Sequence, residues 1–109
     1  MQQDNVIDAI QALLAAPENG DLAALERTLT DGYAKALTLE AERWRIERRI
    51  GEVAATLGGG DATAKTQELV ALAQRLEASD ADLASLRNLL ASLRVRADAA
   101  RATAARVTA

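Results

Sequence analysis

Apolar residues recur every three to four positions along three stretches of the chain. This spacing places them on one face of an α-helix, so the pattern predicts three amphipathic helices. The predicted helices cover about residues 4–16, 21–57 and 63–107. Proline and glycine disfavour a helix, so Pro17 and Gly20 indicate a turn at residues 17–20, and three consecutive glycines indicate a second turn at residues 58–61.

The two long predicted helices each carry one continuous apolar seam. Between Leu22 and Leu57, nine of the eleven seam positions are apolar, and the exceptions are Gly32 and Arg43. In the third predicted helix the seam has a single polar member, Ser79. Seams of this kind are typical of helices that pack along their whole length, as in a coiled coil. Small or polar seam residues such as Gly32 and Ser79 set the register or let two helices approach closely, and the alternative is a hinge at which the bundle opens for a partner.

The composition supports an all-α fold. Hydrophobic residues make up 50% of the 109 residues, but aromatic residues make up only 2% and Phe is absent. Alanine and leucine supply most of the hydrophobic side chains, and both favour helices. The aromatic and β-branched bulk that fills a sheet-based core is missing. We therefore expect a single helical domain over residues 1–109, built as a long antiparallel helical hairpin with a short N-terminal helix.

The short glycine turn determines which residues of the two long helices meet. A reversal of the chain about Gly59 pairs positions on either side of it. It places Ile50 opposite Leu69. It also places Ile46 opposite Leu72, so the two seams face each other.

The distribution of charge agrees with this pairing. Residues 1–42 carry a net charge of −6, and residues 83–109, which they meet in the hairpin, carry +4. Residues 43–60 carry +2, and their partners at 61–82 carry −3. Opposite signs therefore face each other in both halves, which favours this register although single surface ion pairs are weak.

The N-terminal helix needs a surface that covers its own apolar face. The short turn after it returns it along the start of the second helix. There we expect it to pack on a stripe of small residues in the third helix, namely Ala84, Ala91 and Val95. In this arrangement it also covers Tyr33 and Leu37. The result is a three-helix bundle, from which residues from about 40 to 79 extend as a two-helix finger.

The sequence offers no catalytic chemistry. It contains no His and no Cys, so the commonest general base, the thiol nucleophile and the usual zinc ligands are missing. The serines have no base that could activate them. We therefore expect no enzymatic activity, no metal and no cofactor.

Charge and hydropathy limit the partners. A net charge of −3 and a pI of about 4.9 argue against a general nucleic-acid binder. No apolar run approaches the ~20 residues that a membrane span requires. The segment from Met1 to Asp8 carries two acids and no basic residue, unlike a secretory signal. We expect a cytoplasmic protein whose partner is another protein or a second copy of itself.

Trp44, the only tryptophan, lies off the seam of the second predicted helix. Tyr33, Leu37 and Ala41 precede it at helical spacing, which places the four side chains on one face. One interpretation is an exposed anchor for a partner or a second subunit. The other is an indole that lies flat on its own helices under arginine side chains. We take the four residues as candidate protein-binding residues and expect a homodimer centred on Trp44.

Four arginines surround Trp44, at positions 43, 45, 48 and 49. Basic residues beside an aromatic side chain could bind nucleic acid. They could instead form a solvated helix face with ion pairs such as Arg43–Glu47 and Arg48–Glu52. The second interpretation is favoured because no further basic stripe continues the cluster.

The first predicted turn and the helix after it carry two short motifs. The motifs are Glu18-Asn19-Gly20-Asp21-Leu22-Ala23-Ala24-Leu25-Glu26 and Leu39-Glu40-Ala41-Glu42-Arg43. With a short first helix, a glycine loop and a long leucine-rich third helix, the chain resembles the flagellar export chaperones for hook-associated proteins, the FlgN type. The resemblance implies a three-helix cytoplasmic chaperone. It also implies that an amphipathic client helix is gripped by Leu83, Leu86, Leu90 and Leu93.

Together these observations predict a non-catalytic helical protein-interaction module. The resemblance implies an export chaperone that shields the helical terminus of its client. The alternative is a self-associating structural coiled coil or adaptor protein with no client cycle.

Overall fold

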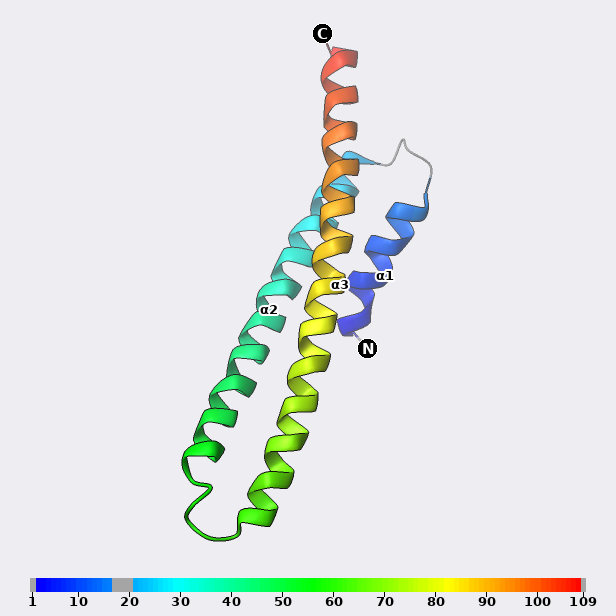
Figure 1. The fold of residues 1–109 in the computed structure, drawn as a ribbon. Coiled ribbons are helices and arrows are strands. Elements are labelled where there is room, and N and C mark those ends of the chain that lie inside the picture. The colour runs from blue at the N-terminus through cyan, green and yellow to red at the C-terminus, as the bar shows by residue number, and fades with distance from the viewer. Residues whose placement is uncertain (1, 17–20, 109) are drawn as a thin grey trace. The chain divides into compact units, whose positions relative to one another are not determined.

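The computed structural model describes residues 2–16 and 21–108, and it is all-α over these residues (Figure 1). Its helices are α1 (Gln2–Ala15), α2 (Leu22–Ala55) and α3 (Ala62–Thr108). The expected helical hairpin with a short N-terminal helix is therefore confirmed, and each predicted helix end lies within two residues of the observed one. The first predicted turn, at residues 17–20, lies outside the described residues.

Side chains and backbone bonds mark where the long helices begin and end. The Asp21 carboxylate accepts a hydrogen bond from the Ala23 backbone N–H (3.0 Å), which caps the start of α2. After α2 the Thr56 hydroxyl donates to the Val53 carbonyl (3.0 Å). The chain then reverses through Gly60, whose φ of 92° is readily adopted only by glycine.

The chain divides into two compact units, and the expectation of a single domain stays a prediction. One unit consists of residues 38–84, close to the predicted finger, and contains the second half of α2, the loop and the first half of α3. The other consists of residues 1–37 and 85–109 and contains three helical segments.

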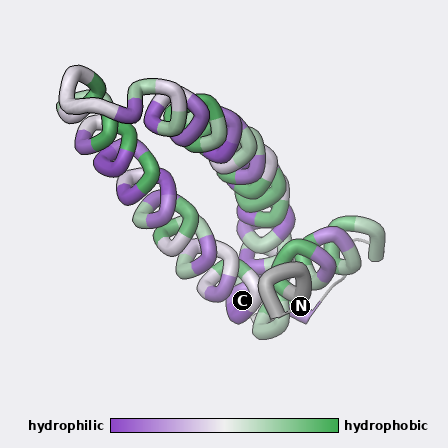
Figure 2. The backbone as a smooth tube through the Cα atoms, turned by 90° about the horizontal axis from the view of Figure 1, so that it is seen from below, coloured by the Kyte–Doolittle hydropathy of each residue, from purple (hydrophilic) through white to green (hydrophobic). Residues whose placement is uncertain are grey.

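The hairpin unit, residues 38–84, has an aliphatic core between its two antiparallel segments. Ile46, Val53 and Leu72 are buried at its centre. Ile50 and Leu69 pack against them, as the expected register requires. Figure 2 shows the underlying pattern, in which hydrophobic and hydrophilic positions alternate along the helices at helical spacing.

The three-segment unit is organised around a close approach at Gly32. Ile10 of α1, which is fully buried, lies at this glycine together with Leu90 of α3. A Cβ atom at position 32 would overlap the Leu90 side chain. The missing side chain therefore makes the notch that receives α1, which is the close approach that the small seam residue predicted.

The expected surface for α1 is wrong. Val95 is 70% exposed, Ala84 and Ala91 are exposed too, and none of the three is covered by α1. Tyr33 is 41% exposed and Leu37 is 66% exposed, so α1 does not cover them either. An alanine stripe offers little apolar area, and the notch at Gly32 buries a whole isoleucine instead.

Arg96 of α3 caps the C-terminal end of α1. Its guanidinium donates hydrogen bonds to the carbonyl oxygens of Leu13 (3.2 Å), Leu14 (2.7 Å) and Ala16 (3.0 Å). The last turn of α1 has no basic residue of its own. Arg96 therefore supplies both the donors and the positive charge that the end of a helix lacks.

Ion pairs between the long helices follow the charge pattern of the sequence. In the three-segment unit, Glu26 of α2 lies 3.8 Å from Arg101 of α3. In the hairpin unit the signs are reversed, since Arg49 of α2 lies 3.0 Å from Glu68 of α3. Arg43 of α2 likewise pairs with Asp80 of α3. These side chains are about half exposed, so the pairs select the register more than they stabilise the fold.

Replacing each helical glycine by alanine should have opposite effects on stability. Gly51 is exposed, and an added Cβ meets no atom within 4 Å, so Gly51→Ala should raise the free energy of unfolding by about 1 kcal/mol. At Gly32 the same gain in helix propensity is opposed by overlap with the buried Leu90. We expect Gly32→Ala to lower the free energy of unfolding by about 1–2 kcal/mol. Urea denaturation measures both, and a stabilised Gly32→Ala would contradict the close approach.

Candidate protein-interaction surface

Trp44 lies on the surface of the hairpin unit. Its side chain belongs to α2 and is 63% exposed. The guanidinium carbon of Arg48, one turn further along, lies 5.8 Å from the centroid of the indole ring, which is a cation–π contact. One arginine therefore lies over the ring, as one interpretation of the sequence expected, while most of the indole stays open to solvent. Ala41, one turn before Trp44, is exposed too.

The two other predicted residues of this face belong to the three-segment unit. Leu37 is 66% exposed. Tyr33 is 41% exposed, and its hydroxyl accepts a hydrogen bond from Arg94 of α3 (3.4 Å). This bond raises the pKa of the Arg94 guanidinium above its ordinary value. Each of these side chains is accessible to another protein.

The predicted client-binding leucines of α3 lie inside the protein. Leu86 and Leu93 have no exposed surface, and Leu83 and Leu90 are at most 4% exposed. Their contacts are supplied by the chain's own helices, so a client could reach them only after helices separate. The largest side chains that are already accessible, Tyr33, Leu37 and Trp44, lie on α2.

The arginines around Trp44 differ in how they are paired. Arg43 lies 3.5 Å from Glu47, as predicted, and Arg49 lies 3.6 Å from Glu52. The predicted partner of Glu52 was Arg48, but Arg48 lies over Trp44 instead. The hydrogen bond and charge of Glu68 raise the pKa of Arg49 above its ordinary value.

A shallow depression of about 290 Å³ opens on the hairpin unit between α2 and α3. Its lining residues are Glu42, Arg45, Ile46, Arg49, Leu72 and Arg75. Ile46 and Leu72 are buried core residues that form an apolar floor, and arginines from both helices stand around it. This depression could not be predicted from the sequence, because Arg75 lies 30 positions after Arg45 along the chain.

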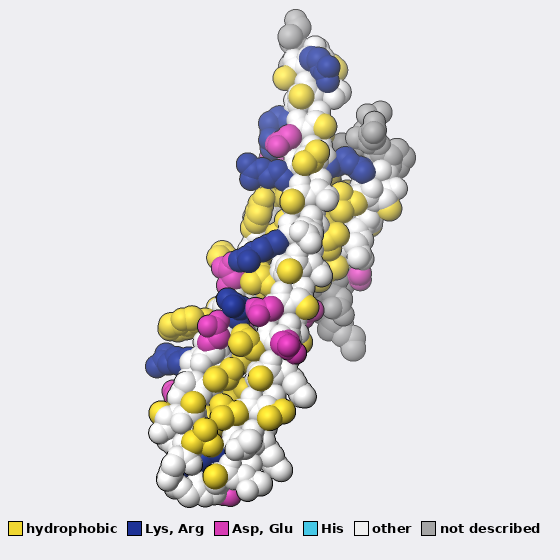
Figure 3. All heavy atoms as spheres, in the orientation of Figure 1, with side chains coloured by type: hydrophobic (Ala, Val, Ile, Leu, Met, Phe, Trp, Pro, Cys, Tyr) yellow, Lys and Arg dark blue, Asp and Glu magenta, His cyan; other side chains and the backbone are white. Residues whose placement is uncertain are grey.

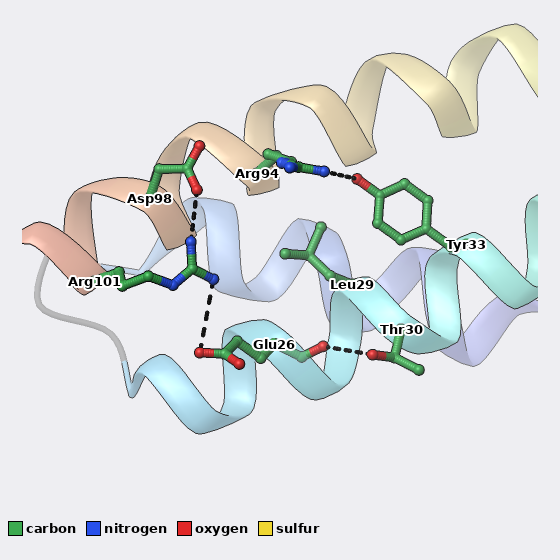
Figure 4. Close-up of a pocket in the computed structure, with 7 residues that line it drawn as sticks. All are labelled: Glu26, Leu29, Thr30, Tyr33, Arg94, Asp98 and Arg101. Carbon is green, nitrogen blue, oxygen red and sulfur yellow. Dashed lines mark hydrogen bonds and ion pairs between the residues drawn. The ribbon is translucent and has the colours of Figure 1, made fainter.

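A second depression, of about 250 Å³, lies in the three-segment unit (Figure 4). Its polar groups bind one another. Arg101 lies 2.9 Å from Asp98 and 3.8 Å from Glu26, and the Thr30 hydroxyl donates to the Glu26 carbonyl (3.1 Å). Since these groups are already paired, their contacts hold α2 and α3 together, and the depression is not a candidate ligand site.

The described residues hold no group of three or more acidic, His or Cys side chains placed to bind a metal ion. Within residues 2–16 and 21–108, no helix combines the length and the apolar character that a membrane crossing requires. Comparison with known proteins finds no matching family model, no matching curated protein and no matching solved structure.

Proposed function

We propose that this chain is a non-catalytic protein-interaction module that associates with a second copy of itself through the α2 surface around Trp44. The observation that carries the proposal is the exposure of Trp44, which is 63% exposed. Tryptophan is enriched among the residues that contribute most to protein–protein binding. An indole left in water forgoes the free energy that burial of its large apolar surface would supply.

The surroundings of Trp44 suit a self-complementary contact. A twofold interface brings the same patch of both copies together. On α2, Arg48 follows Trp44 by one turn and Glu40 precedes it by one turn. Antiparallel packing of two α2 surfaces about Trp44 therefore sets Arg48 of one copy beside Glu40 of the other. The arginine that lies over the indole is then ready to bridge the two copies.

An export-chaperone role, with a cytoplasmic location and a flagellar client, is supported by the resemblance of residues 18–26 and 39–43. Such a role requires the buried leucines from Leu83 to Leu93 to become accessible, so we place the primary contact on the open surface at Trp44. A structural or adaptor role needs no such opening. Binding of a helical client that increases solvent access to Leu86, measured by hydrogen exchange of α3, would favour the chaperone.

Replacing Trp44 by alanine should weaken self-association. Loss of a central aromatic residue typically costs about 2 kcal/mol of binding free energy, which corresponds to a roughly thirtyfold higher dissociation constant. Sedimentation velocity at several concentrations measures this constant for the parent and for Trp44→Ala. In the parent dimer the Trp44 fluorescence should be shifted to the blue relative to a solvated indole.

Val70→Ala is the matched control, because Val70 is 54% exposed in the same unit but lies on α3. It should leave the dissociation constant unchanged. A parent that sediments as a monomer at high micromolar concentration, with the fluorescence of a fully solvated indole, would exclude the homodimer.

A further inference from the structure

The depression on the hairpin unit combines an apolar floor with a charged wall on each side. Ile46 is 7% exposed and Leu72 is 5% exposed, and both belong to the aliphatic core of this unit. Arg45 stands on α2 and Arg75 stands on α3. On the face shown in Figure 3, hydrophobic side chains gather between the two helices at the end of the hairpin unit that carries the loop.

Two of the three arginines in the lining have no acidic partner among the described residues. Arg49 is bound by Glu52 and Glu68. Among the residues that the structure describes, Arg45 and Arg75 make no ion pair and no hydrogen bond. The charge of Arg49 is offset by Glu52 and Glu68, so the positive charge of the lining comes from Arg45 and Arg75, against the one carboxylate of Glu42. This small positive charge is local, on a protein whose net charge is −3.

We infer that this depression is a docking site for an acidic amphipathic helix of a partner protein. The inference rests on the proposed function as a protein-interaction module and names the chemistry of a partner. The occupant is a helix whose aliphatic side chains enter the depression over the small part of Ile46 and Leu72 that lines it. Aspartate or glutamate residues on both sides of that apolar stripe reach Arg45 on one wall and Arg75 on the other.

The geometry favours a helix over other occupants. The groove between two packed helices accepts the ridge of side chains of a third helix, whose apolar anchors recur at three- and four-residue spacing. Acidic residues that flank such a stripe project to both sides, toward the walls where the two unpaired guanidiniums stand. Guanidinium binds carboxylate through two parallel hydrogen bonds, which orients the incoming helix.

A single sign of charge on the occupant fits this site better than a mixture. Glu42 is the one carboxylate in the lining, and it lies on the same helix as Arg45. A nucleic acid would meet two free arginines here and net negative charge on the rest of the protein.

The test uses the full chain and two synthetic peptides labelled with fluorescein. Each has about 18 residues, which is long enough to form a helix, with leucine on one stripe flanked by glutamate in one peptide and by lysine in the other. Fluorescence anisotropy should show binding of the glutamate peptide, weaker binding at higher salt, and much weaker binding of the lysine peptide. The double variant Arg45→Glu/Arg75→Glu should bind the glutamate peptide about tenfold more weakly, since it replaces two exposed attractions by repulsions, and should gain affinity for the lysine peptide.

The matched control is Arg27→Glu/Arg106→Glu, which changes the net charge equally at exposed positions outside the hairpin unit. It should bind the glutamate peptide as the parent does. Equal binding of the two peptides, equal binding by the Arg45/Arg75 variant and the parent, or no binding of the glutamate peptide would each overturn the inference. Self-association that is lost on Arg45→Glu/Arg75→Glu, without any peptide binding, would assign the depression to a second copy instead.

The homodimer and the docking site can be contradicted independently of each other. If the parent is a dimer that Trp44→Ala dissociates but no peptide binds, the acidic partner is excluded and the proposed function stands. If the parent is a monomer at every concentration and the glutamate peptide binds with the expected charge dependence, the homodimer is excluded and the docking site stands.

Discussion

Leu72→Asp is expected to lower the free energy of unfolding by about 4 kcal/mol, because it places an unpaired carboxylate in an aliphatic core. Leu72 is 5% exposed and shares its cluster with Ile46 and Val53. Burial favours the protonated form of the introduced carboxyl and so raises its pKa. The loss should therefore be smaller in acidic buffer than at neutral pH, where the charged form has to be buried or the helices have to part. Urea denaturation followed by circular dichroism measures the free energy of unfolding at both pH values.

Val70→Asp provides the comparison for this experiment. Val70 lies two residues before Leu72 on the same helix but is 54% exposed, so the same chemical group enters water instead of the core. Its effect should stay within about 0.5 kcal/mol, as for most surface substitutions. Equal effects at the two positions would mean that Leu72 does not face Ile46.

Replacing Gly58, Gly59 and Gly60 together by alanine should convert the loop into helix and open the hairpin. Alanine gains about 1 kcal/mol per position over glycine in a helix. Gly60 has a φ of 92°, so alanine there is also strained in the reversed form. The two long helices then run on as one, and each seam finds its partner on a second chain in a swapped dimer. Small-angle scattering should show a particle with a greater maximum dimension than the parent.

Gly60→Asn is the variant that separates backbone conformation from helix propensity. Asparagine tolerates positive φ better than alanine does, so this variant should keep the reversal. A triple alanine variant with the scattering profile of the parent would show that the glycines are not needed for the turn.

Most of the fold was predictable because its determinants are local. The spacing of leucines from Leu69 to Leu93 defines one face of a helix without reference to any other part of the chain, and three glycines in succession end a helix wherever they occur. The partner of each seam also followed, because a short loop leaves only one antiparallel register. The burial of Leu72 and Ile46 in one cluster confirms that register.

The placement of α1 was wrong because it depends on two features of shape that appear only in three dimensions. The sequence indicated a close approach at Gly32. It did not indicate which residue would pack there, and in the structure that residue is Ile10. The contact from Arg96 to the end of α1 spans more than 80 residues at Leu13 and Leu14. No periodicity in the sequence encodes it.

The candidate interaction surface also has one residue that the sequence could identify and one that it could not. Trp44 could be selected from the sequence because it lies off the seam of its own helix, and its exposure in the structure agrees with its position there. Arg75 could not be selected, because its importance comes from standing across a depression from Arg45. Whether an arginine lacks an acidic partner depends on the residues that lie near it in the folded protein.

The cap that Arg96 places on α1 also sets an order of events during synthesis. The carbonyls that it binds belong to residues 80 to 83 positions earlier, so at about 5–20 residues per second the cap arrives roughly 4 to 16 seconds after α1 has been made. A helix of 14 residues is marginal by itself in water. α1 is therefore capped only after residues 38–84 have all been translated. A chain whose synthesis stops before Arg96 therefore lacks the donors and the positive charge that cap α1.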